Sequence, residues 1–222
     1  MGQHWEVEMK RKLAGAISAV MLLLSACGVE YQPTQSGVFI KLDKSLEGAY
    51  IETFDNENYN IEDLEKMGQE EVQAYNKEQA NLEFYSSEQT ENILPISLDS
   101  VKKEGNNVVV RMSYQTAEDY STFNADDIAL AGGNTIYTEN LSDTMVDLTG
   151  EFVTVTGETA TIEEIMSHGD YQLVYVNYEA DVTVEGEVAY VSTNVNCNSK
   201  NNVNTPAGQD AYIIFKKAGG IF

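Results

Sequence analysis

Several residue types are scarce in this chain of 222 residues, which contains one Trp, two Cys, two His and three Pro. Basic residues are also few, since 13 Lys and Arg face 36 Asp and Glu and give a formal charge of −23. So acidic a chain lacks the basic face of a nucleic-acid binder and is not attracted to anionic lipid headgroups. With 42% hydrophobic residues, however, it can form a globular core rather than a wholly disordered chain.

The first 26 residues have the layout of an export signal. Lys10, Arg11 and Lys12 form a positive run, and an apolar stretch follows over residues 13–24. This stretch is too short for a membrane-spanning helix, which needs about 20 residues. We expect translation to begin at Met9, because the acidic residues before it make a poor start for a signal peptide.

The export signal ends in Leu24-Ser25-Ala26-Cys27-Gly28. This sequence resembles the lipobox of bacterial lipoproteins. The resemblance implies a diacylglyceryl group on the sulfur of Cys27 and cleavage between Ala26 and Cys27. Two acyl chains anchor a protein stably, so the resemblance implies an exported protein held by lipid on the outer face of the cell membrane. The alternative is an ordinary secretory signal that happens to contain a cysteine.

Cleavage would change the composition of the mature chain. It would remove Trp5 and His4, leaving His168 as the remaining histidine and Cys197 as the remaining unmodified cysteine. Residues 27–222 hold ten Lys and Arg against 34 Asp and Glu, a formal charge of −24. A single thiol cannot form an internal disulfide, so the core alone must hold the fold.

The mature chain is expected to consist of a lipidated tether over residues 27–37 and a globular domain over residues 38–222. The tether is polar, and ten extended residues reach at most about 35 Å. Alternating apolar residues predict strands at 38–42, 46–54, 93–101, 108–114, 152–155, 171–178, 181–184, 188–195 and 211–216. We expect a tight turn at 185–187 and an Asn-rich loop at 196–208.

Three helices are predicted. Apolar residues at spacings of three and four mark the longest helix, which begins after Asn60 and runs to about Gln79: Ile61, Leu64, Gly68, Val72 and Tyr75. We interpret it as lying on a sheet, with a partner-binding helix as the alternative. Thr116 and Thr161 begin shorter helices, and Gly169 is the expected C-cap of the second.

These elements predict an α+β fold with predominantly antiparallel sheet and a few amphipathic helices. Residues 125–149 give mixed signals, and two half-domains meeting there are one possible organisation. Phe54-Asp55, Tyr59 and the segment 190–195 (YVSTNV) also resemble a group of uncharacterised short lipoproteins from clostridial-type Gram-positive bacteria. That resemblance implies a location and no chemistry.

Candidate catalytic residues are scarce. A Ser-His-Asp or Cys-His arrangement would need His168, which lies at the predicted end of a helix, where a structural role is favoured. A catalytic cysteine needs nearby basic groups that lower the pKa of its thiol, and Cys197 has Lys200 alone nearby in the sequence. We therefore interpret Cys197 as a thiol without a catalytic role. We therefore assign no catalytic residue.

Metal and nucleotide signatures are also missing. One His and one Cys cannot make the usual zinc site. The acidic run from Asp55 to Asn60 departs from the EF-hand template, because Asn60 replaces the glycine and Lys66 the bidentate glutamate. Gly132-Gly133 is not followed by the Lys of a phosphate loop. We expect no cofactor and no metal, although weak calcium binding by the acidic surface stays open.

Two functional classes remain. The favoured one is a non-enzymatic envelope lipoprotein that binds another envelope protein, a peptide or a glycan. The alternative is a lipid-anchored hydrolase that cleaves a cell-wall or polysaccharide substrate with paired carboxylates. A concave pocket with two inward carboxylates would favour the hydrolase.

Overall fold

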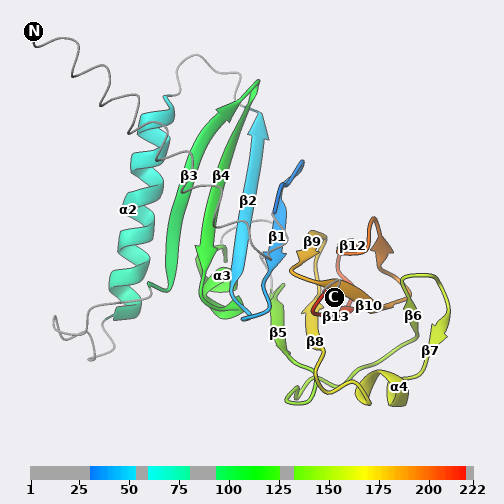
Figure 1. Ribbon diagram of the computed structural model, residues 1–222. Helices are drawn as coiled ribbons and strands as arrows, with labels where there is room; N and C mark the ends of the chain where they lie inside the picture. Colours follow the sequence, from blue (N-terminus) through cyan, green and yellow to red (C-terminus); the bar gives the residue numbers. More distant parts are fainter. Residues whose placement is uncertain (1–30, 54–59, 81–93, 126–132, 219–222) are drawn as a thin grey trace, which may run out of the picture. The chain divides into compact units, whose positions relative to one another are not determined.

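The computed structural model describes residues 31–53, 60–80, 94–125 and 133–218 (Figure 1). The predicted signal peptide and Cys27 lie outside the described residues. Residues 31–222 form a compact unit of their own, so we expect this part of the chain to fold without residues 1–30. Within the described residues, the structure has no helix that is both long enough and apolar enough to span a membrane.

The first sheet combines strands from both ends of the chain. Its order is β11-β12-β9-β1-β2-β4-β3. The strands are β1 (Gly37–Ile40), β2 (Leu46–Thr53), β3 (Ile96–Glu104), β4 (Asn107–Tyr114), β9 (Ala180–Val184), β11 (Asn196–Cys197) and β12 (Asn202–Thr205). All neighbouring strands are antiparallel except β1 and β9, which run parallel.

The second sheet has six strands in the order β5-β8-β13-β10-β6-β7, all antiparallel. They are β5 (Ile136–Asn140), β6 (Phe152–Thr154), β7 (Thr159–Ala160), β8 (Gln172–Val176), β10 (Glu187–Ser192) and β13 (Ala211–Lys216). The expectation of mostly antiparallel sheet with few helices is confirmed, although strands predominate over helices.

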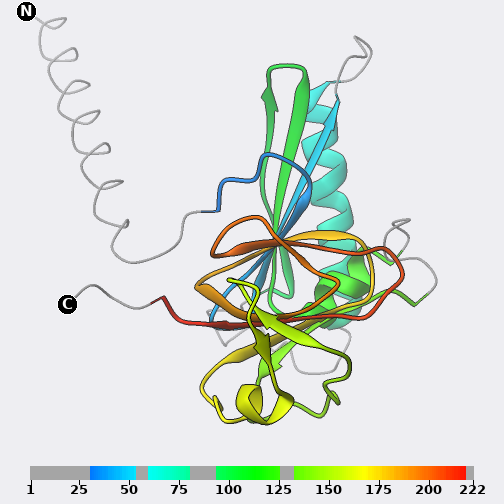
Figure 2. The same ribbon diagram turned by 90° about the vertical axis from the view of Figure 1, so that its right-hand side faces the viewer.

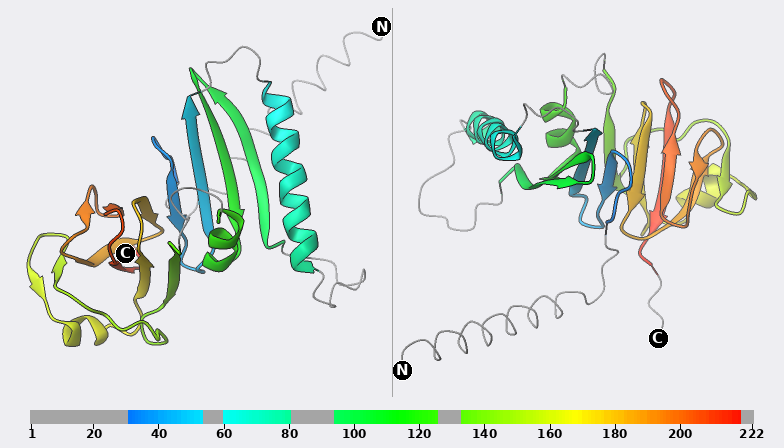
Figure 3. Two further views of the ribbon diagram at one scale, coloured as in Figure 1. Left: turned by 180° about the vertical axis from the view of Figure 1, so that it is seen from behind. Right: turned by 90° about the horizontal axis from the view of Figure 1, so that it is seen from above.

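The three helices among the described residues begin where their capping residues predict. They are α2 (Ile61–Ala80), α3 (Ala117–Phe123) and α4 (Ile162–Met166). Thr116 caps α3 by accepting a hydrogen bond from the Asp119 amide, and Thr161 does the same for α4 with Glu164. Viewed from above, α2 and α3 lie on the same face of the first sheet (Figure 3). Figure 2 shows the β3–β4 hairpin and α2 extending beyond the second sheet.

A single buried cluster joins the two sheets. It includes Val38 and Ile40 from the first sheet and Val174 and Ile213 from the second. The predicted turn at 185–187 forms, with the Gly186 amide donating to the Val184 carbonyl, and it carries the chain from one sheet to the other. A Cβ atom at position 186 would overlap the carbonyl oxygen of Lys216, so glycine is required there.

Three expectations are wrong in detail. Tyr31, assigned to the tether, is 6% exposed and stacks on Phe39 with ring centroids 5.1 Å apart, so residues 31–37 belong to the folded part. The Asn-rich segment 196–208 contains β11 and β12 rather than a loop alone. Gly169 is not a C-cap, because α4 ends at Met166 and Gly169 has no positive φ. The parallel pairing of β9 with β1 places strands from both sides of residues 125–149 in the first sheet.

Candidate ligand-binding cleft

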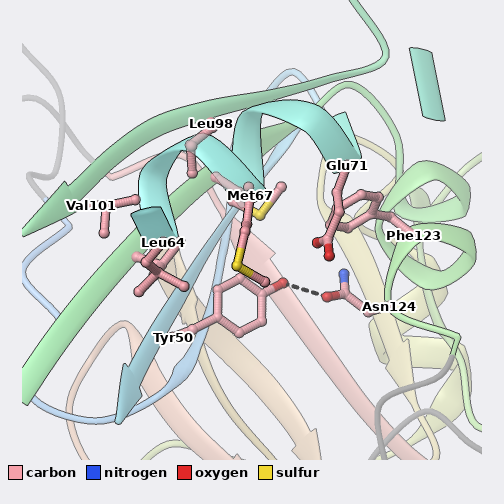
Figure 4. Close-up of a pocket in the computed structure, with 11 residues that line it drawn as sticks. Tyr50, Leu64, Met67, Glu71, Leu98, Val101, Phe123 and Asn124 are labelled. Atoms are coloured by element: carbon pink, nitrogen blue, oxygen red, sulfur yellow. Dashed lines mark hydrogen bonds between the residues drawn. The ribbon is translucent and has the colours of Figure 1, made fainter. Parts of the chain in front are cut away.

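A cleft of about 270 Å³ opens between α2 and α3, with the first sheet as its floor (Figure 4). Most of the side chains around it are apolar. The floor residues are Tyr50, Leu98, Val101, Val110 and Met112, and the wall residues are Leu64, Met67, Gly68 and Glu71 of α2 with Phe123 and Asn124 at the end of α3. The cleft is therefore built from elements that are distant in the sequence.

The way α2 sits on the sheet leaves this space open. Its C-terminal half is fixed by Val72 and Asn76, both buried, and the Asn76 side chain donates to the Ile96 carbonyl and accepts from the Ile96 amide at 2.9 and 3.1 Å. The N-terminal half is covered less, and Met67 is 57% exposed. Gly68 lies against the floor, where an added Cβ would be 3.2 Å from Leu98 Cδ2.

One end of the cleft is polar, with the neutral side chains of Tyr50 and Asn124 and the Glu71 carboxylate beside Asn124 (Figure 4). The Tyr50 hydroxyl donates to Asn124 Oδ1 at 2.8 Å and lies 2.7 Å from the Tyr114 hydroxyl. Asn124 is itself fixed by donating to the Tyr120 carbonyl at 2.7 Å. Burial raises the pKa of Tyr50 far above its usual value of 10, so the phenol stays neutral. Because the Tyr50 proton and both Asn124 amide hydrogens are donated within the protein, these two neutral side chains can accept a hydrogen bond from a ligand.

Glu71 is the one carboxylate among the described residues that line the cleft. A glycosidase needs two carboxylates facing one another across its substrate, and the described lining does not supply the second. The arrangement can hold an apolar group next to a neutral hydrogen-bonding end, and one carboxylate lies at the α2 wall (Figure 4).

The cysteine and histidine singled out from the sequence lie apart from the cleft. The His168 ring stacks on Tyr171 with centroids 4.6 Å apart, and its Nε2 lies 3.2 Å from the Tyr190 hydroxyl beside the second sheet. Cys197 is exposed on β11, at the edge of the first sheet, and partial burial raises the pKa of its thiol. The structure does not bring them together. Ala26 and Cys27 lie outside the described residues.

The acidic segment before α2 is described only at its end. Asn60 caps α2, because its Oδ1 accepts from the Glu62 amide at 3.0 Å, while residues 55–59 lie outside the described part. Lys66 is exposed and lies 3.8 Å from Glu70. Gly133 has a positive φ of 92°, and Gly132 is not described. In the described ranges, no cluster of three or more His, Cys, Asp and Glu residues is placed to hold a metal ion.

Sequence reasoning missed most of the cleft residues. The available signal for the cleft was Gly68, which interrupts the apolar face of α2. Glycine is unusual there, because it makes a helix about 1 kcal/mol less stable than alanine does. Nothing in the sequence placed Tyr50 beside Asn124, which lies 74 residues away. Comparison with known proteins adds no guide, because no family model matches this chain and neither a curated protein nor a solved structure matches it significantly.

Proposed function

We propose that the chain is an exported, lipid-anchored binding protein that holds an apolar group of its ligand in the cleft between α2 and α3. The observation that carries the proposal is the apolar lining of this cleft with its neutral hydrogen-bonding end at Tyr50 and Asn124. Ligand sites are typically concave and apolar, with a few polar groups that fix orientation.

The size of the cleft limits what it holds. Pockets for drug-sized ligands usually measure about 300–1,000 Å³, and this one measures about 270 Å³. It therefore receives one large side chain or a group of similar size rather than a whole lipid. The rest of the ligand lies across the mouth of the cleft, which the half-exposed Met67 borders.

The sequence pattern that ends at Cys27 supports the location. A basic run, an apolar stretch and the resemblance to a lipobox all favour export and lipid anchoring. Because Tyr31 already packs on Phe39, four peptide links separate Cys27 from the fold, a reach of at most about 14 Å. The domain would then work close to the membrane surface.

Cell fractionation tests the location. Cys27→Ser removes the acceptor of the lipid, and Cys197→Ser is the matched control because it changes the other cysteine of the mature chain. We expect the wild type and Cys197→Ser in the membrane fraction, and Cys27→Ser released or left unprocessed. Cys27→Ser in processed form on the membrane would show that lipid on this residue is not the anchor.

A fluorescent probe tests the cleft. N-phenyl-1-naphthylamine is a neutral apolar dye that brightens when it leaves water, and it can be titrated into residues 27–222 carrying Cys27→Ser. We expect saturable binding that weakens several-fold in Met67→Gln and is unchanged in Met166→Gln, a methionine of similar exposure on α4. No saturable binding, or equal loss in both variants, would contradict the proposal.

A further inference from the structure

We propose that the ligand is a basic peptide that inserts one large apolar side chain into the cleft and places Lys or Arg side chains against the two helices. This inference rests on the proposed function and adds the chemical class of the ligand. Three observations support it. The helices that form the walls are acidic, Glu71 makes no hydrogen bond or ion pair with another described residue, and the negative charge is spread along the whole length of α2.

Both walls are strongly acidic. The six acidic residues of α2 face two lysines, Lys66 and Lys77: Glu62, Asp63, Glu65, Glu70, Glu71 and Glu78. The α3 wall adds Glu118 and Asp119 and has no basic residue. Of these residues Glu71 lines the cleft itself, and the others lie elsewhere on the same two helices. An excess of one sign of charge around a cleft attracts ligands of the opposite sign. The walls therefore favour a cationic ligand over an anionic one.

Glu71 connects the charge to the cleft. It lies on α2 among the lining residues, and Figure 4 shows its side chain beside Phe123 and Asn124. Among the residues that the structure describes, it makes no hydrogen bond or ion pair. By contrast, the Oε1 of Glu70, the preceding residue, lies 3.8 Å from the Nζ of Lys66. Glu71 is thus available to a basic group that arrives with an apolar one.

The distribution of charge favours a peptide over a small cation. A helix of 20 residues is about 30 Å long, and acidic residues occur from its first turn to its last. A single small cation would meet one or two of these carboxylates, whereas an extended chain with several basic residues meets more. The apolar cleft then fixes the register of that chain by accepting one side chain.

The same charge argues against other occupants. Residues 54–59 and 81–93, which flank α2 in the sequence, carry five acidic residues and no Lys or Arg. A second copy of the mature chain brings a formal charge of −24. The headgroup of an anionic lipid is repelled in the same way. A basic peptide is the occupant that agrees with both the apolar cleft and its acidic walls.

Residues 27–222 contain no Trp, so the fluorescence of a Trp-containing probe reports on the peptide alone. The probe is an acetylated and amidated nonapeptide with a central Trp and two Lys on each side, and its control replaces each Lys with Gln. We expect saturable binding of the Lys peptide with a blue-shifted Trp emission. The Gln peptide should bind at least fivefold more weakly, and added salt should weaken the Lys peptide.

Protein variants locate the charge. Glu71→Gln should weaken the Lys peptide about two- to fivefold, as expected for an exposed ion pair. Glu163→Gln, an exposed residue of α4, is the control and should leave the affinity unchanged. The N-phenyl-1-naphthylamine affinity should also stay at the wild-type value in Glu163→Gln, which lies outside the cleft.

Three results would overturn the proposal. Equal affinities of the Lys and Gln peptides would show that charge does not select the ligand, while dye binding would leave the proposed function standing. Dye binding that appears only after Phe84→Ser and Tyr85→Ser would identify residues 81–93 as the occupant. Sedimentation of a dimer that excludes the dye would identify a second copy as the occupant.

Failure of both the dye and the peptide to bind any variant would instead contradict the proposed function itself.

Discussion

At the scale of single residues, Asn76 shows how a polar side chain positions the cleft. It is 9% exposed and satisfies both backbone groups of Ile96, the first residue of β3. Backbone groups buried without partners are unfavourable, so this pair of hydrogen bonds fixes α2 at one position along the strand. Asn76 therefore fixes the position of the α2 wall, although Asn76 does not itself line the cleft.

We predict that Asn76→Ala destabilises the domain by about 2–3 kcal/mol, because two buried backbone groups lose their partners. The exposed Gln69→Ala on the same helix should change the free energy of unfolding by less than about 0.5 kcal/mol. Urea unfolding of both variants measures this. Equal effects would show that the Asn76 hydrogen bonds do not hold the helix.

Three tyrosines, one buried and two half-buried, should make the domain less stable at high pH. Burial raises the pKa of Tyr50 and Tyr114 far above 10, and burial followed by the negative charge of Asp119 raises the pKa of Tyr75 to about 12. In the unfolded chain a tyrosine ionises near 10. The unfolded state then loses protons first, so stability is full below pH 10 and falls as pH rises further.

We therefore expect the free energy of unfolding in urea to decrease from pH 10 to 11.5, and the absorbance of ionised tyrosine to rise in step with unfolding. Tyr50→Phe should reduce this dependence on pH while lowering stability at neutral pH, because the Asn124 hydrogen bond is lost. Stability that is constant from pH 8 to 11.5 would contradict the assigned burial of these hydroxyl groups.

At the scale of elements, β12 shows why part of the fold could not be predicted from the sequence. Asn is depleted in strands, and the alternation of Asn202 and Asn204 with Val203 and Thr205 is short. The strand forms because the Asp181 carboxylate on β9 accepts hydrogen bonds from both asparagines, at 2.9 and 3.3 Å. Such a partner, distant in the chain, is invisible to a local pattern.

We predict that Asp181→Ala speeds hydrogen exchange of the backbone amides of residues 202–205. It should also loosen residues 31–37, because Gln35 donates to the same carboxylate at 2.8 Å. Asp170→Ala, an exposed residue after α4, is the control and should leave both segments protected. Unchanged exchange at 202–205 would show that β12 needs no support from Asp181.

Elements with strong local signals were predicted well. The helix from Ile61 and strands β1, β2, β3 and β4 follow their apolar periodicity, and Thr116 and Thr161 mark helix starts through their side-chain oxygens. Tyr31 was assigned to the tether because a single aromatic residue in a polar segment shows no periodic apolar pattern. The packing of Tyr31 on Phe39 is a tertiary contact.

At the scale of the whole described unit, the cleft depends on long-range pairing. The parallel contact of β1 with β9 joins residues more than 140 positions apart and ties the sheet that carries the cleft to the second sheet. Local patterns indicate one helix that contains Gly68 and a second that begins after Thr116. They could not indicate that these helices cover the same face of one sheet, because that follows from strand order.

The place where the chain enters the unit predicts how a lipid anchor would orient it. Tyr31 packs on Phe39, whereas the neighbouring Val38 and Ile40 point into the cluster that includes Val72 of α2. Because side chains alternate along a strand, Tyr31, to which a lipid anchor would be connected, lies on the face opposite the helices. The cleft would then open away from the membrane.

Labelling with a large maleimide reagent tests this orientation in a Cys197→Ser background. Thr34→Cys and Gln69→Cys are both at exposed positions, one beside Tyr31 and the other on α2. On cells without a wall, Gln69→Cys should react several-fold faster, and the difference should disappear when Cys27→Ser releases the protein. Equal rates in the anchored form would contradict the orientation.

The most direct test of the account is to locate a bound apolar group by nuclear magnetic resonance. Residues 27–222 with Cys27→Ser, labelled at methyl groups, are mixed with N-phenyl-1-naphthylamine, and intermolecular nuclear Overhauser effects are recorded. The account predicts contacts from the dye to the methyl groups of Leu98, Val110 and Met112. Contacts confined to Met145, Met166 or other exposed methyl groups would show that the cleft between α2 and α3 is not the binding site.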